Sequence, residues 1–143
     1  MKKTISIGIQ VFSDLREQDC FFVDKTNFIK EWWENRDVVT LITRPRRFGK
    51  TLNMSMLECF FSKKYANRAD LFEGLSIWQD ETYRKLQGAY PVIFLSFAAV
   101  KAGNLEDAKT QIKQEIARLY WENRNLMKED IFGEDERELY YRT

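Results

Sequence analysis

The chain has 143 residues, the size of one ordinary domain and enough to bury a hydrophobic core. Hydrophobic residues make up 44% and charged residues 31%, a balance typical of globular proteins, which argues against a disordered chain. The formal net charge of +1 gives no argument for a nucleic-acid or membrane surface. Because the chain contains no histidine, it excludes histidine-based acid–base chemistry and histidine metal ligands of its own.

The cysteines and the apolar runs favour a cytoplasmic protein. Cys20 and Cys59 are far apart and form no Cys-x-x-Cys pair, so a zinc site or a disulfide framework is not expected. The short apolar segment after Met-Lys-Lys is interrupted by Gln10, which argues against a signal peptide. No stretch reaches the roughly 18 apolar residues that a membrane span requires.

The N-terminal part predicts an extended lead-in followed by an amphipathic helix. We expect residues 5–12 to be extended, residues 14–18 to form a short turn or helix, and residues 21–23 to form a brief strand-like run. Thr26 stands where an N-cap is needed. The large apolar residues after it recur at helical spacing up to about residue 35, namely Phe28, Ile29, Trp32 and Trp33.

Two apolar runs predict strands. Residues 38–42 and residues 91–97 are short, nearly continuous and rich in branched or aromatic side chains. Such runs are typical of strands that are buried on both faces of a parallel sheet. Between them we expect a helix from Lys50, with Leu52, Met56, Cys59 and Phe60 at core spacing, and then a looser region anchored by Leu71, Phe72, Leu75, Ile77 and Trp78.

A third helix is predicted after the second apolar run. Asn104 is placed to cap it, and Glu106 and Asp107 supply negative charge in its first turn. Its apolar stripe has helical periodicity and consists of Leu105, Ala108, Ile112, Ile116 and Leu119. The order strand, helix, strand, helix predicts an α/β fold.

The loop between residues 44 and 51 carries the chemistry. It reads Arg-Pro-Arg-Arg-Phe-Gly-Lys-Thr and matches the last three positions of the phosphate-binding loop, with Arg44 where the first glycine usually stands. Gly49 lets the backbone approach a phosphate, Lys50 supplies a positive charge, and the Thr51 hydroxyl is a ligand for Mg²⁺. The helix N-terminus adds amide dipoles that favour an anion.

Two other interpretations of this loop stay open. It could be an ordinary basic turn between two elements. It could also belong to a non-enzymatic module in which Arg44, Arg46 and Arg47 hold a phosphate of nucleic acid or another anion, with binding that falls steeply as salt rises.

The residues from Leu41 to Leu57 strongly resemble the bacterial AAA-ATPase-like family, in which the loop reads Arg-Pro-Arg-Arg-Phe-Gly-Lys-Ser/Thr. Four other segments resemble it too: residues 7–10, 22–26, 71–75 and 90–97. The resemblance therefore covers at least residues 5–97, and arginine at position 44 is the family's own pattern.

This resemblance implies a P-loop NTPase, with a parallel sheet flanked by helices, that binds ATP and Mg²⁺. It places residues 1–37 in an N-terminal lead-in and residues 38–143 at the start of the NTPase core. Thr51 would be the metal ligand. The implied nucleotide-binding residues are Arg44, Pro45, Arg46, Arg47, Phe48, Gly49, Lys50, Thr51 and Leu52. Longer members often carry a C-terminal domain that resembles PD-(D/E)XK nucleases, which leaves nucleic acid open as a partner of the full-length protein.

The sequence shows no acidic residue at the position where ATP hydrolysis requires one. A second strand normally ends in an acidic residue that helps to hold Mg²⁺, but the run at residues 92–97 ends in Ser96 and Phe97. In the family the acidic strand comes later than residue 143. We therefore expect an N-terminal fragment with an incomplete sheet and unassigned catalytic residues. ATP binding is expected, and Mg²⁺-dependent hydrolysis is expected only in the full-length domain.

Other residues have structural interpretations that compete with functional ones. Asp24, Lys25 and Thr26 could contact nucleotide, but a turn capped by Thr26 is favoured. Trp32 and Trp33 could stack on adenine, although packing in the core is favoured. The acidic stretch at residues 129–138 is interpreted as a solvated surface in preference to a metal site.

Overall fold

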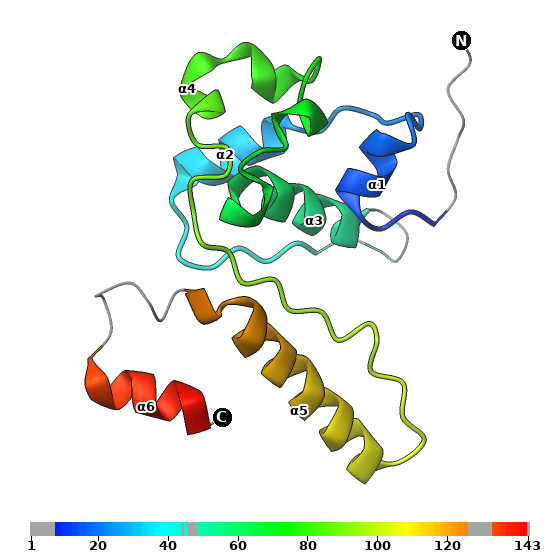
Figure 1. Ribbon diagram of the computed structural model, residues 1–143. Helices are drawn as coiled ribbons and strands as arrows, with labels where there is room; N and C mark the ends of the chain where they lie inside the picture. Colours follow the sequence, from blue (N-terminus) through cyan, green and yellow to red (C-terminus); the bar gives the residue numbers. More distant parts are fainter. Residues whose placement is uncertain (1–7, 44, 46–48, 126–132, 143) are drawn as a thin grey trace. The chain divides into compact units, whose positions relative to one another are not determined.

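The computed structural model describes residues 8–43, 45, 49–125 and 133–142 (Figure 1). The chain divides into two compact units, residues 1–92 and residues 93–143. The first unit contains helices α1 (Phe12–Glu17), α2 (Asn27–Asn35), α3 (Lys50–Phe61) and α4 (Glu81–Arg84). Three short 3-10 helices lie between α3 and α4: η1 (Lys63–Tyr65), η2 (Ala69–Leu71) and η3 (Ser76–Gln79). The second unit contains α5 (Leu105–Glu122) and α6 (Glu134–Arg142).

The predicted parallel sheet is wrong for the described part of the chain, which is mostly helical and has no strand. An isolated parallel bridge joins Ser62 to Tyr90. The run at residues 38–42 is open to solvent, with Val38 100% and Leu41 82% exposed, and the run at residues 92–97 leaves Ile93 64% exposed. A strand exists only when a second strand satisfies its backbone groups. Apolar composition therefore does not make these runs a sheet, and the fold class is not α/β.

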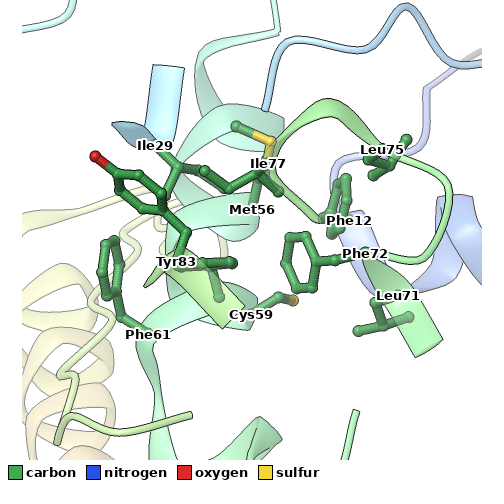
Figure 2. Packing of buried hydrophobic residues seen from close by; sticks show 11 residues of the cluster. Phe12, Ile29, Met56, Cys59, Phe61, Leu71, Phe72, Leu75, Ile77 and Tyr83 are labelled. Atoms are coloured by element: carbon green, nitrogen blue, oxygen red, sulfur yellow. The ribbon is translucent and has the colours of Figure 1, made fainter. Parts of the chain in front are cut away.

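The core of the first unit surrounds α3 (Figure 2). Phe72 stacks on Phe12 of α1 at 5.2 Å between ring centroids and meets Phe60 of α3 edge-on at 5.0 Å. Aromatic pairs in these geometries stabilise a core beyond the area that they bury. The buried cluster joins α1, α2, α3 and the segment between α3 and α4, and it comprises Phe12, Ile29, Met56, Cys59, Phe60, Phe61, Leu71, Phe72, Leu75, Ile77 and Tyr83.

The helix prediction for α3 and the anchors after it are confirmed. Met56, Cys59 and Phe60 are buried, and Leu52 packs against the same cluster. The predicted anchors Leu71, Phe72, Leu75 and Ile77 are also buried, and Trp78 packs against them. The segment between α3 and α4 is therefore held against the core by a few large side chains.

The C-terminal end of α3 is completed by residues far along the chain. The Gly88 amide donates to the Phe60 carbonyl at 2.8 Å, and the Tyr90 amide donates to the Phe61 carbonyl at 2.9 Å. These bonds satisfy carbonyls that a helix end leaves without partners. Gly88 has φ +67°, and a Cβ there would lie 2.3 Å from the Cα of Ala66. Glycine is therefore required for this approach.

In the second unit, α5 begins as the sequence predicts. The Asn104 side-chain oxygen accepts a hydrogen bond from the Asp107 amide at 2.8 Å, which is a standard N-cap. The predicted apolar stripe is only partly covered, because Leu119 is buried and Leu105 is 67% exposed. The helix is instead supported along its exposed side by pairs such as Arg118 with Glu115 at 2.9 Å.

Candidate functional site

The start of α3 has a left-handed glycine directly before the helix. Gly49 precedes the helix with φ +73° and ψ 21°, a left-handed conformation that other residues rarely adopt. Its carbonyl accepts the first helical bond, from the Asn53 amide at 2.9 Å. As a glycine, the N-cap residue Gly49 has no side chain that could cap the first turn. The amide groups and the positive end of the helix dipole are therefore presented at this end of α3.

The described loop residues divide between surface and core. Thr51 and Pro45 are exposed, and Lys50 is half-buried. The side chain of Leu52, another predicted site residue, packs against the core and has a structural role. Its backbone amide belongs to the first turn of α3. The remaining predicted residues, Arg44, Arg46, Arg47 and Phe48, lie outside the described residues.

Helix α1 is fixed to the middle of α3 by buried polar contacts. The Phe12 amide donates to Ser55 Oγ at 3.0 Å. One turn further along α3, the backbone of Ser13 is hydrogen-bonded to the Cys59 thiol. Sequence analysis missed Ser55, although its spacing from Leu52 and Cys59 places it on the core face of the helix.

Cys59 is a structural residue. It is fully buried, and both cysteines of the chain are free thiols. Burial, assisted by the negative charge of Glu58, raises the pKa of Cys59 to about 11. The thiol is therefore protonated at neutral pH, and a protonated thiol is not a nucleophile or a metal ligand.

Asp24 and Thr26 are engaged in a hydrogen-bond network that joins α2 to η3. One Asp24 oxygen accepts from the Thr26 amide at 2.9 Å and from its hydroxyl at 2.6 Å, and the other accepts from the Ser76 amide and hydroxyl, both at 2.7 Å. The Ile77 amide donates to the Thr26 hydroxyl at 3.1 Å. Thr26 is the N-cap residue of α2, as predicted, but its side chain makes no capping hydrogen bond to the helix.

This network stabilises the charged form of Asp24. Burial on its own would raise the pKa of Asp24, but the hydrogen bonds from Thr26 and Ser76 outweigh burial and lower it below 3.8. Both carboxylate oxygens are occupied by protein donors. The structural interpretation of the segment at residues 24–26 therefore accounts for these contacts.

Trp32 and Trp33 pack in the first unit. Trp33 stacks on Phe61 at 5.3 Å and also contacts Tyr90, and the Trp32 indole donates to Thr40 Oγ1 at 3.1 Å. These contacts match the favoured prediction of core packing.

Acidic side chains do not gather into a metal site within the described ranges, where no group of three His, Cys, Asp or Glu residues could hold an ion. Residues 129–132 of the acidic stretch lie outside these ranges, and Glu134 and Glu138 lie on α6. In the same described ranges, no helix has the length and apolar character to cross a membrane.

Comparison with known proteins identifies the family. The model of the family described as predicted AAA-ATPase matches residues 6–140 of this sequence. The chain belongs to the predicted AAA-ATPase family. One similar protein is an uncharacterized protein in the vnfD 5′ region of Azotobacter chroococcum mcd 1, which is 32% identical to this chain over 114 residues. No solved structure matches the chain.

The two proteins of this comparison differ greatly in length. The match covers 79% of this chain but only 20% of the Azotobacter protein. The chain therefore spans about a fifth of the length of that relative. The start of α3, which is the candidate functional site, lies within the family match.

Proposed function

We propose that this member of the predicted AAA-ATPase family binds ATP through the loop at residues 44–51. The observation that carries the proposal is the left-handed Gly49 directly before Lys50 at the start of α3. This arrangement puts a flexible cation and a set of backbone donors beside one another, which is the chemistry that binds a polyphosphate.

Each residue has a role in this proposal. The Lys50 ammonium neutralises the terminal phosphates, while the amides of Thr51 and Leu52 donate to phosphate oxygens. Arg44, Arg46 and Arg47 add positive charge, and Pro45 and Phe48 shape the loop. Thr51, which is exposed in the first turn, fits a Mg²⁺ ion. Magnesium takes most of its oxygens from phosphates and water, so one protein hydroxyl is compatible with it. When bound, the ion would offset the charge of the phosphates.

Hydrolysis is proposed only for a longer protein that supplies an acidic partner for Mg²⁺ and a group that positions water. The division into a lead-in at residues 1–37 and the start of the NTPase core at residues 38–143 stays a prediction, as does nucleic acid as a partner of such a protein. We further propose a cytoplasmic location, which the two free, buried cysteines support.

The proposal is tested by titrating the chain with a fluorescent ATP analogue and Mg²⁺. We expect saturable binding that Lys50→Ala weakens at least about tenfold, since a charge-assisted contact with phosphate is lost. Lys85→Ala is the matched control, because this exposed lysine lies at the C-terminal end of α4 and outside the loop. Equal affinities for the two variants would contradict the proposal.

The same titration distinguishes the anion-binding alternative. A module that uses only the basic loop would bind DNA without Mg²⁺, with an affinity that falls steeply as salt rises. A nucleotide site would instead prefer ATP with Mg²⁺ and would depend on both Lys50 and Thr51.

A further inference from the structure

Residues 8–11, which lead into α1, lie outside the hydrophobic core although they directly precede the buried Phe12. Val11 is 41% exposed, Gln10 is exposed and Ile9 is half-buried, although Phe12 directly after them is fully buried. The Gln10 side chain makes no hydrogen bond with the described part of the chain. This short stretch therefore offers an apolar surface together with an amide that is open to a ligand.

Two contacts fix the direction of this segment relative to α3. Phe12 is held at Ser55, and Ser13 is held one turn further on, at Cys59. The chain therefore advances toward the C-terminal end of α3 as it enters α1. Followed backward from Phe12, it leads toward the N-terminal end, and Figure 1 shows residues 8–11 entering α1 beside this half of α3.

The spacing suits a nucleotide. Ser55 lies five residues after Lys50, which corresponds to about 7.5 Å along a helix axis. Gln10 lies two residues before Phe12, which adds at most about 7 Å of extended chain. A triphosphate at the start of α3 would thus place its attached nucleoside within reach of residues 9–11.

We infer that residues 9–11 form the nucleoside side of the site and that Gln10 recognises the adenine base. This inference rests on the proposed function and deepens it. The glutamine amide offers a donor and an acceptor together, which matches the amino group and ring nitrogen on one edge of adenine.

The test compares three ligands, each in the presence of Mg²⁺ and measured by calorimetry on the full chain. They are ATP, inosine triphosphate, which lacks the amino group of adenine, and inorganic triphosphate, which lacks the nucleoside. We expect Gln10→Ala to weaken ATP binding about 3- to 10-fold, the range for one hydrogen bond. Binding of inorganic triphosphate should not change, and the preference of the wild-type chain for ATP over inosine triphosphate should disappear.

Two controls separate this inference from the proposed function. Gln18→Ala removes another exposed glutamine, which lies after α1, and it should bind all three ligands as the wild-type chain does. Lys50→Ala should weaken ATP and inorganic triphosphate alike. Thermal unfolding confirms that each variant is folded.

The outcomes are distinct. If Gln10→Ala binds ATP as tightly as Gln18→Ala does, or loses ATP and inorganic triphosphate equally, the inference about Gln10 is overturned while the phosphate site stands. If the folded wild-type chain binds neither ligand, the phosphate site and the inference both fail.

Discussion

Asp24 shows how one side chain can connect segments that are far apart in sequence. Its two oxygens accept four hydrogen bonds, from the amides and hydroxyls of Thr26 and Ser76. Only an ionised carboxylate accepts at every one of these positions. The turn before α2 and the start of η3 are therefore held together by a negative charge.

Replacing this charge should destabilise the chain at neutral pH. Asp24→Asn keeps the shape of the side chain but loses acceptors, and we expect the free energy of unfolding to fall by about 1 kcal/mol, since part of the carboxylate remains in water. The measurement is urea unfolding. Asp37→Asn is the control, because Asp37 is exposed and has no hydrogen bond within the described residues.

The effect of Asp24→Asn should depend on pH in a defined direction. The pKa of Asp24 is lowered on folding from 3.8, so its ionisation stabilises the folded state at pH values above 3.8. This contribution is lost as the pH falls through the lowered value. The stability difference between wild type and Asp24→Asn should therefore shrink in acid. A difference that stays constant from neutral pH to well below 3.8 would rule out this account.

The two predicted caps show which residues a sequence can place. Asn104 caps α5 as predicted, because its partner, Asp107, lies in the adjacent turn. Thr26 was predicted to cap α2, yet its hydroxyl bonds Asp24 and the Ile77 amide. Ile77 lies far along the chain, and no local pattern indicates that it competes for this hydroxyl. Gly49 and Lys50 resemble Asn104, since a local motif predicted where their helix begins.

Among the elements, α1 is too short to be stable alone and depends on contacts with other segments. Phe12 fills the core, and Arg16 reaches the segment around η2. Arg16 Nε donates to the Leu71 carbonyl at 2.7 Å, and one terminal nitrogen donates to the Glu73 carbonyl at 2.8 Å. A guanidinium therefore fixes α1 to two backbone acceptors at once.

Removing this guanidinium should loosen α1. We expect Arg16→Ala to lower the free energy of unfolding by about 1–2 kcal/mol, because two charge-assisted hydrogen bonds are lost. Arg16→Lys should recover little of this loss, since an ammonium cannot reproduce the fork geometry. Denaturant unfolding of both variants measures the effect. Full recovery by lysine would show that charge alone matters and that the paired geometry does not.

Helices α2, α3 and α5 could be predicted from their periodicity and the strands could not, for the same physical reason. The periodicity that placed α3 and α5 is local, since helical hydrogen bonds join residues four apart. The runs at residues 38–42 and 92–97 have strand-like composition, but a strand depends on a partner that composition does not specify. Val38 and Leu41 are exposed in the structure because no described segment pairs with them.

At the scale of the molecule, the two units differ in how much they bury. Nearly all buried residues of the described chain lie before residue 93, and Leu119 is the one buried residue described after it. Backbone hydrogen bonds open locally where few apolar contacts hold them. The second unit should therefore open more often than the first.

Hydrogen exchange measured by mass spectrometry tests this difference. We expect amides in α5 to exchange at least about tenfold faster than amides in α3, because a small difference in opening free energy gives a large ratio of rates. Ligand binding at the start of α3 should slow exchange in α3 and leave α5 unchanged. Equal protection of the two helices in the free chain would show that α5 is stabilised by more than the described contacts.

The closing of α3 by residues 88–90 has a consequence for the order of events during synthesis. When α3 has just left the ribosomal exit tunnel, Gly88 and Tyr90, whose amides donate to the Phe60 and Phe61 carbonyls, are still inside it. We expect the last turn of the helix to fray until Gly88 and Tyr90 arrive. The helix that begins at the candidate phosphate site thus reaches its final form only after the whole first unit has left the ribosome.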